Sequence, residues 1–297
     1  MITAAEAQRL LETPDLIAIG VQADEARKAR HGDRVTFVRV LDVPVLSPAP
    51  SVVPSEAGEV RITGRPENAE RIESLVQSLV QSSIQSPGVS GCSRTVTGFA
   101  LHDLEHLGPL PPLAARLKAL GLEMIAEAAI DQLANPAEAI RAVHGAGLDI
   151  ARLTLQKSPR DPVAMLQRVR DVAAAFPGGV ARAFAPLART LDPALPTTGY
   201  DDVKLVALAR LFLDNVDTIQ VDWTLYGPKL AQVALTFGAN DLDAVPLDPA
   251  AVNLLGPRRA PLEEVRRNIL AASLVPVRRN GRFESMETPE TAAGAPR

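Results

Sequence analysis

The stretch TIQVDWTLYGPKLAQVALTFGANDLDAV, from Thr218 to Val245, decides the fold of this chain. It begins with an apolar run, Thr218–Trp223, and ends with a second one, Asp241–Val245. Between the two runs lies a helical stripe, formed by Leu230, Val233, Ala234 and Phe237. Short apolar runs that alternate with segments of helical period are typical of βα units in a parallel sheet. The stretch therefore predicts strand, helix and strand in an α/β protein.

The same alternation extends over most of the chain and predicts eight strands. They are Arg34–Val40, Glu59–Thr63, Thr95–Ala100, Glu123–Glu127, Asp149–Leu155, Val180–Pro186, Thr218–Trp223 and Asp241–Val245. Eight βα steps favour a TIM-type (β/α)8 barrel, in which the carboxyl ends of the strands build the pocket. A partial barrel fits nearly as well, because the four prolines within Leu41–Gly58 predict a loop where a helix is due.

The length of 297 residues fits one barrel of this type. We expect an N-terminal helical segment over residues 1–33, with a helix from Thr3 to Gly32, and then a barrel over residues 34–284. The last residues, 285–297, are rich in Thr, Pro, Ala and Gly and predict a disordered tail. The sequence thus predicts one main domain.

The composition narrows the possible partners. A net charge of −4 disfavours binding to nucleic acid, because phosphate recognition needs clustered Lys and Arg. No stretch approaches the roughly 20 apolar residues of a membrane span. The lone cysteine, Cys92, has no partner for an internal disulfide and is interpreted as a small loop or core residue. We therefore expect a cytoplasmic protein without a nucleic-acid or membrane partner.

Several short motifs occur in order along the chain. They are Ala23–Val38, Thr198-Gly-Tyr-Asp-Asp202, Leu213-Asp-Asn215, Trp223, Gly227-Pro-Lys229 and Gly238-Ala-Asn-Asp-Leu242. Together they resemble the radical S-adenosylmethionine enzymes of menaquinone and deazaflavin biosynthesis, namely aminofutalosine synthase, dehypoxanthine futalosine cyclase and the deazaflavin-precursor synthase. The resemblance implies a barrel with a small-molecule pocket.

The chain departs from that family at the cluster motif. The family carries Cys-x3-Cys-x2-Cys after its first barrel strand, where three thiolates hold a [4Fe–4S] cluster that leaves one iron open for S-adenosylmethionine. The matching segment here, LDVPVLSPAPSVVPSEAGEV (Leu41–Val60), has neither cysteine nor histidine, and it looks shortened. Because such clusters require soft sulfur ligands, we expect no cluster and no radical chemistry. S-adenosylmethionine binding is left doubtful.

Candidate ligand-binding residues lie near three predicted strands. Asp222 and Trp223 end one strand, where a carboxylate beside an indole could bind a ring system; equally, Trp223 could fill the core and Asp222 could cap the next helix. Asn240 and Asp241 could bond a ribose or an amine, although Asn and Asp also stabilise simple turns. Glu127 is a candidate acid at the end of the fourth strand.

Basic residues and histidines give further candidates. Lys229, at a helix start, and Lys157, after the fifth strand, could bind an anionic group; a plain helix start and a solvated loop explain them equally well. Arg182 and Arg189 flank the sixth strand with the same ambiguity. The segment His102-Asp-Leu-Glu-His106 matches the zinc pattern H-x-x-E-H but has no evident third ligand, so we expect no metal site.

Three functions remain open at this stage. The first is an auxiliary or binding subunit that associates with an active radical enzyme, or with itself, and holds a nucleoside-like ligand. The second is an enzyme of different chemistry that uses acids such as Asp222, Asp241 or Glu127 for acid–base work on a futalosine-like or other polar metabolite. The third is a purely structural barrel.

Overall fold

The computed structural model describes residues 2–85, 93–177, 179–190, 194, 196–247 and 261–286. Eight parallel strands form a ring in which each pairs with the next and β8 pairs with β1. The strands are β1 (Arg34–Pro44), β2 (Glu59–Thr63), β3 (Thr95–Ala100), β4 (Met124–Ala129), β5 (Asp149–Leu155), β6 (Ala181–Ala188), β7 (Thr218–Asp222) and β8 (Asp241–Pro246). The barrel is therefore closed, which confirms the TIM-type prediction and excludes the partial barrel.

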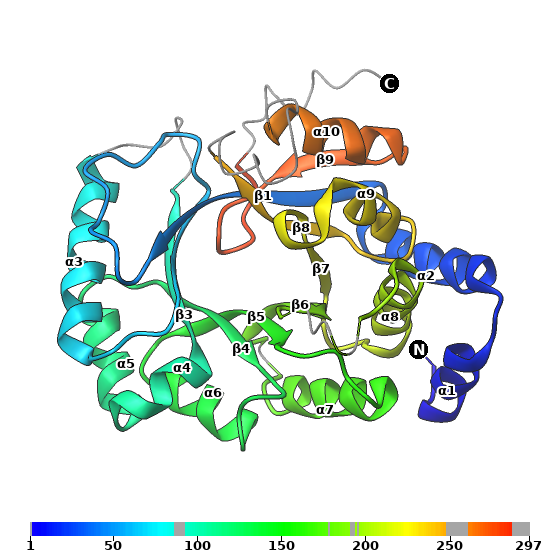
Figure 1. Ribbon diagram of the computed structural model, residues 1–297, viewed down its shortest axis with the longest axis horizontal. Coiled ribbons are helices and arrows are strands. Elements are labelled where there is room, and N and C mark those ends of the chain that lie inside the picture. Colours follow the sequence, from blue (N-terminus) through cyan, green and yellow to red (C-terminus); the bar gives the residue numbers. More distant parts are fainter. Residues whose placement is uncertain are drawn as a thin grey trace.

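Helices surround the barrel and bury their apolar faces against its outer surface (Figure 1). They are α3 (Ala69–Gln85), α4 (Leu101–Leu104) with the short η1 (Glu105–Leu107), α5 (Leu110–Ala119), α6 (Pro136–His144), α7 (Pro162–Ala174), α8 (Gly199–Phe212), α9 (Trp223–Leu235) and α10 (Pro261–Ala271). In α3, the buried face is formed by Ile72, Leu75, Val76 and Leu79. The apolar core thus lies between helices and strands, and the space inside the ring is left for other side chains.

The N-terminal segment is helical, but it forms two helices, α1 (Ala4–Glu12) and α2 (Leu16–His31). The prediction of one helix from Thr3 to Gly32 was wrong at Pro14. A proline disfavours the helical conformation of the residue before it, and Thr13 has an extended ψ of 139°. Both helices contact α8 outside the barrel.

Strand β1 is longer than predicted and is staggered between its neighbours. Thr36–Val40 pairs with β8, whereas Val40–Pro44 pairs with β2, so Leu41–Pro44 is strand where a loop was expected. Pro44 is tolerated because it ends the strand. No helix occurs between β1 and β2, as the prolines predicted. The stagger makes Asp42 part of a strand end.

The C-terminal segment closes the amino end of the barrel. Strand β9 (Val275–Arg278) pairs with Arg34–Phe37, on the same edge of β1 that β2 uses farther along. Arg279 follows and is completely buried, with Nε and Nη2 donating to the two carboxylate oxygens of Asp241 at 2.6 and 2.7 Å. Predicted tail residues 287–297 lie outside the described part of the chain, as does Cys92. Among the described helices, none is long and apolar enough to cross a membrane.

Candidate functional site

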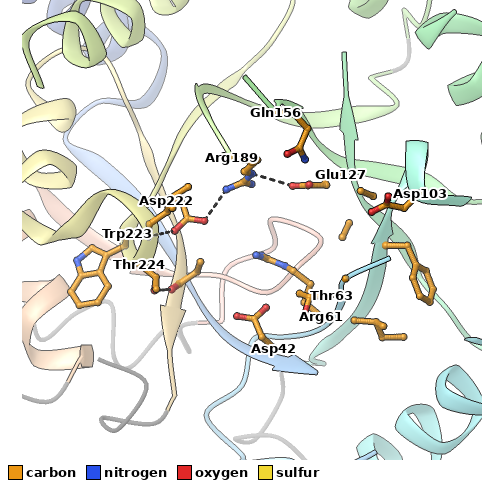
Figure 2. Close-up of a pocket in the computed structure, with 17 residues that line it drawn as sticks. Asp42, Arg61, Thr63, Asp103, Glu127, Gln156, Arg189, Asp222, Trp223 and Thr224 are labelled. Atoms are coloured by element: carbon orange, nitrogen blue, oxygen red, sulfur yellow. Dashed lines mark hydrogen bonds and ion pairs between the residues drawn. The ribbon is translucent and has the colours of Figure 1, made fainter. Parts of the chain in front are cut away.

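A cavity of about 780 Å³ opens at the carboxyl ends of the strands, and we call it the mouth cavity. Figure 2 shows polar side chains from strand ends around the barrel directed at it. Those that line it are Asp42, Arg61, Thr63, Asp103, Glu127, Gln156, Arg189, Asp222 and Thr224. Apolar walls come from Ile62, Phe99 and Ala100. Its position is the usual ligand site of parallel barrels.

Asp42 has an unpaired carboxylate within this cavity. The residue is accessible to solvent from the cavity, and its side chain makes no hydrogen bond or ion pair with the described residues. Burial by the surrounding walls raises the pKa of Asp42 above its usual value; Arg61 opposes this rise, and the nearby carboxylates of Asp243 and Glu59 add to it. The side chain is thus an acceptor that the protein itself leaves unused.

Arg189 links three strand ends across one side of the mouth cavity. Its Nε lies 3.1 Å from Glu127 Oε2, and its Nη1 lies 2.7 Å from Asp222 Oδ2. The other oxygen of Asp222 accepts the N–H of Leu225 at 2.8 Å and so caps α9. Burial raises the pKa of Asp222, although Arg189 opposes the shift. Both carboxylates are therefore held by the protein.

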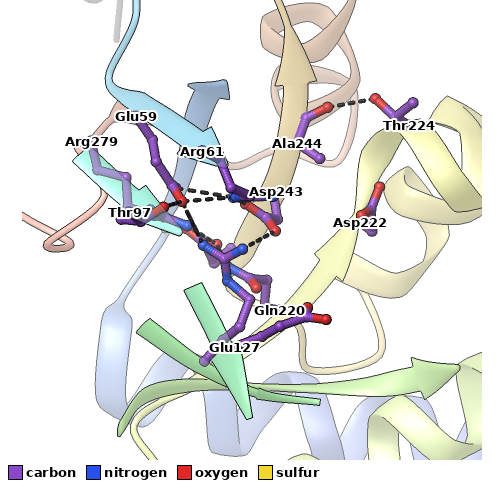
Figure 3. A network of polar contacts seen from close by, with 12 residues as sticks. Glu59, Arg61, Thr97, Glu127, Gln220, Asp222, Thr224, Asp243, Ala244 and Arg279 are labelled. Atoms are coloured by element: carbon purple, nitrogen blue, oxygen red, sulfur yellow. Dashed lines mark hydrogen bonds and ion pairs between the residues drawn. The ribbon is translucent and has the colours of Figure 1, made fainter. Parts of the chain in front are cut away.

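Beneath the cavity, charged side chains fill the middle of the barrel (Figure 3). Arg61 Nε donates to Glu59 Oε1 at 2.8 Å, and its Nη2 donates to Asp243 Oδ1 at 2.7 Å. Arg152 lies on the opposite wall and reaches the same two acids, each at 3.1 Å. Burial alone would raise the pKa of Glu59, but Arg61 and Arg152 reverse this and lower it to about 2. The floor of the site is thus a fixed ionic layer.

Two residues at the mouth cavity have unusual backbone conformations. Phe99 and Ala244 have φ values of 67° and 55°, in the left-handed region that side chains other than glycine rarely adopt. The carbonyl of Ala244 accepts the hydroxyl of Thr224. Backbone strain of this kind persists only where the surrounding structure holds the residue in place, and it occurs often at ligand sites.

Three of the predicted site residues lie at this cavity. Asp222 and Glu127 line it with their carboxylates. Trp223 also contributes to its wall, but it is only 1% exposed, and its indole is directed away from the cavity into the apolar core. Asp222 caps α9, so the capping role expected as an alternative is present alongside its place in the cavity.

The other four predicted residues lie elsewhere. Lys229 is exposed on the outer helix α9, whose second part begins after Gly227 and Pro228. Lys157 is also exposed, and its backbone N–H donates to Asp131. Neither lysine lines the mouth cavity.

Asn240 and Asp241 lie at the amino end of β8, away from the mouth cavity. The side-chain oxygen of Asn240 accepts the N–H of Ile219 at 2.9 Å and a bond from Arg210. Asp241 is completely buried against Arg279, and it also accepts from Gln220 at 2.6 Å. The structure thus places these two side chains in contacts that stabilise the barrel.

Sequence reasoning missed Asp42, Arg61, Arg152, Glu59 and Asp243. The signal was present in two short strands, EVRIT and DLDAV, where charged residues alternate with apolar ones. Alternation means that one face of the strand is polar, and in a helix-covered barrel that face must point inward. Asp42 was missed for a different reason, because the predicted strand stopped at Val40.

The segment between β1 and β2 does not fit an iron–sulfur cluster. Val45–Gly58 contains no cysteine or histidine, whereas such clusters need thiolate ligands. Across the described residues, no group of three or more His, Cys, Asp and Glu side chains is placed to hold a metal ion, and His102 and His106 form no such group.

Sequence comparisons find relatives for part of the chain. A family model described as the CofH/MqnC C-terminal region matches residues 186–292. Aminodeoxyfutalosine synthase from Thermus thermophilus is 35% identical over 42% of this chain and 36% of its own length. Cyclic dehypoxanthine futalosine synthase from Streptomyces coelicolor is 26% identical over 54% of this chain and 42% of its own length. The chain thus matches less than half the length of either relative.

A third relative comes from a different reaction. The 5-amino-6-(D-ribitylamino)uracil–L-tyrosine 4-hydroxyphenyl transferase of Methanosphaerula palustris is 40% identical over 27% of this chain and 23% of its own length. Among solved structures, methylornithine synthase superposes with a TM-score of 0.65 at 12% identity, covering 94% of this chain and 95% of its own. The hydrogenase maturase HydG from Carboxydothermus hydrogenoformans superposes with a TM-score of 0.64 at 14% identity, and the match covers 93% of this chain and 76% of HydG.

These structural likenesses show the fold alone, because the identities are low. The sequence matches carry the relationship, and they include the predicted motifs from Thr198 to Leu242 within or beside the matched region. The sequence matches therefore relate the chain, through residues 186–292 above all, to the radical S-adenosylmethionine proteins of menaquinone and deazaflavin biosynthesis.

Proposed function

We propose that the chain is a cluster-free, ligand-binding member of its family that serves as an auxiliary subunit in futalosine-type menaquinone biosynthesis. One combination of observations carries the proposal: the mouth cavity is large and lined by polar side chains, whereas the adjoining Val45–Gly58 segment offers no thiolate. A barrel with a pocket but without cluster ligands is suited to holding a metabolite and not to generating a radical from it.

The proposed ligand is a nucleoside-like small molecule. A volume of about 780 Å³ is in the usual range for small-molecule sites. The donors and acceptors around the cavity suit hydroxyls and ring nitrogens, and Phe99 and Ile62 offer apolar contact for a ring. The names of the futalosine-pathway relatives support the same class of ligand.

The ligand-binding part of the proposal is tested by blocking the cavity. Ala100 is half-buried in its wall, so Ala100→Phe fills space without removing a charged contact. Calorimetric titration with futalosine and related nucleosides is expected to show binding to the native chain and at least a tenfold loss in this variant, because a bulky ring would occupy the ligand's place.

Ala181→Phe is the matched control. Ala181 is also half-buried, but it lines a groove at the amino end of the barrel. This variant is expected to bind like the native chain. Absence of binding to every nucleoside, or equal loss in both variants, would refute a nucleoside site in the mouth cavity.

The auxiliary role and the missing cluster need separate tests. Anaerobic reconstitution with iron and sulfide is expected to leave the purified chain without bound iron. Stoichiometric iron with S-adenosylmethionine cleavage would overturn the proposal that the chain is cluster-free.

The partner is proposed to be an active radical enzyme of the same family. Co-expression with such an enzyme is expected to yield a complex by size-exclusion chromatography, and consistent elution as separate proteins would contradict it.

A second candidate function is an enzyme that works by acid–base chemistry, and Asp42 is the observation that favours it. Of the acids first considered, Glu127 and Asp222 are engaged by Arg189 and Asp241 by Arg279. Asp42 is unpaired among the described residues, and its raised pKa suits a proton donor. Turnover of a pathway metabolite that falls at least 100-fold in Asp42→Asn would support this function; equal turnover would exclude Asp42 as the acid.

A further inference from the structure

The charges around the mouth cavity indicate which ligands it would prefer. This inference rests on the proposed function of the cavity as a ligand site. We propose that the cavity selects a positively charged, amine-bearing small molecule and discriminates against its phosphorylated counterpart, with Asp42 as the contact for the amine and Arg61 as the donor to a neighbouring ligand oxygen.

The first support is an excess of negative charge in and directly below the cavity. Among the described residues, six carboxylates face three guanidinium groups there. The acids are Asp42, Glu59, Asp103, Glu127, Asp222 and Asp243, and the bases are Arg61, Arg152 and Arg189. These described groups do not balance in charge, so a cationic ligand would complete the balance.

The second support is the way the guanidinium groups are used. Arg189 is engaged with Glu127 and Asp222, with Asp243 at 3.7 Å, and Arg152 is completely buried below. These contacts leave little to receive a phosphate. Acceptors are available instead, because Asp42 has two free oxygens, and no hydrogen bond from the described residues reaches Glu127 Oε1.

The third support is independent of the acids. Arg61 is only 7% exposed, yet its Nη1 has no hydrogen-bond partner among the described residues, whereas Nε and Nη2 are bonded to Glu59 and Asp243. Figure 2 shows this guanidinium directed into the cavity near Asp42. A donor that faces the cavity and is bonded to no described protein group is available to a ligand oxygen. An amine beside a hydroxyl or ether oxygen would match both groups.

The test uses three ligands that share one scaffold and differ in charge. 5′-Amino-5′-deoxyadenosine carries a positive group, adenosine is neutral and adenosine 5′-monophosphate is negative. Calorimetric titration is expected to give the tightest binding for the amine, with adenosine about tenfold weaker and the phosphate weaker still, because a charge-assisted hydrogen bond to Asp42 is replaced first by a neutral contact and then by repulsion.

Variants then assign the preference to Asp42. Asp42→Asn keeps the shape of the side chain and is expected to reduce the preference for amine over adenosine to within about twofold. Because the Asp42 side chain makes no hydrogen bond with the described residues, this variant should fold normally. Asp171→Asn is the matched control, since it removes one exposed carboxylate from the outer helix α7 and should leave the preference unchanged.

The outcomes separate the inference from the proposed function. Equal or tighter binding of the phosphate, or an amine preference that persists in Asp42→Asn, would refute the charge selection while leaving a nucleoside site intact. If no nucleoside binds, putrescine serves as a fourth probe: binding that depends on Asp42 would keep the amine site and overturn the nucleoside function. No binding of any of the four would overturn both.

Discussion

At the scale of single residues, the Asp42 carboxylate is expected to lower the stability of the fold while serving as a binding group. A carboxylate with a raised pKa is less stable when ionised in the folded protein than in the unfolded chain. Its charge therefore lowers the stability of the fold at neutral pH, and no partner within the described residues offsets the loss. Functional sites commonly carry this kind of unfavourable term, which disappears when the group is replaced.

We accordingly expect Asp42→Asn to raise the melting temperature at pH 7. The folded-state pKa lies above the ordinary value of 3.8, so the native chain loses stability relative to the variant as the pH rises from that value through the raised pKa. Below about pH 3.8 the two proteins should melt together. Scanning calorimetry at several pH values measures the difference, and a lower melting temperature for the variant at pH 7 would contradict the unpaired state of Asp42.

At the scale of elements, the turn between α9 and β8 depends on Gly238. Its φ is +96°, and a Cβ placed there would lie 2.7 Å from the Cβ of Arg210. Arg210 is buried, donates through Nε to the carbonyl of Gly238 at 2.8 Å, and has its pKa lowered to about 9, chiefly by burial. The turn thus joins α8 to the start of β8 and cannot accept a side chain without moving both.

Gly238→Ala should therefore lower the free energy of unfolding by about 3 kcal/mol, from backbone strain and from the close contact together. Gly179→Ala is the control, because Gly179 also has a positive φ, of +74°, but no atom lies within 4 Å of the position that its Cβ would take. That change should cost only about 1 kcal/mol of strain. Urea denaturation of both variants tests the difference, and equal losses would show that the contact with Arg210 is unimportant.

At the scale of the molecule, the ionic layer inside the barrel ties the fold to pH. Glu59 is completely buried between Arg61 and Arg152 and has a pKa of about 2, and the pKa of Asp243 is lowered as well. A depressed pKa stabilises the fold above the unfolded-state value, here 4.5 for Glu59, and the benefit is lost as the pH falls towards about 2. Lowering the pH should consequently destabilise the barrel, because it protonates the buried carboxylates of this layer.

Glu59→Gln should remove about 3 to 5 kcal/mol of stability at pH 7, because it leaves two buried guanidinium groups short of a partner. The variant should also lose part of the decline in stability between pH 4.5 and pH 2. Glu73→Gln is the control, because Glu73 pairs with Arg116 at the surface, where such pairs contribute about 1 kcal/mol or less. Chemical denaturation over this pH range measures the free energy of unfolding of both variants. A loss for Glu59→Gln as small as that for Glu73→Gln would refute the stabilising role of the ionic layer.

The strands could be predicted from the sequence because each is a short apolar run with a clear boundary. Most predicted boundaries agree with the structure within two residues. The errors fall at Pro14 and at Leu41–Pro44, and both involve proline. In the first case proline divided a helix that the pattern of side chains suggested was continuous; in the second, pairing with β2 extended a strand through residues that looked like a loop.

What the sequence by itself determined was the alternation of βα units, the family match over residues 186–292, and the absence of thiolates from the β1–β2 segment, since all three are local or compositional properties. Only the tertiary structure decided which charges meet. Glu59, Arg152 and Asp243 come from three strands far apart in the chain, and Asp42 is left without a partner among the described residues only because the stagger of β1 carries it up to the mouth cavity. Ring closure sets these contacts, and the sequence order does not contain them.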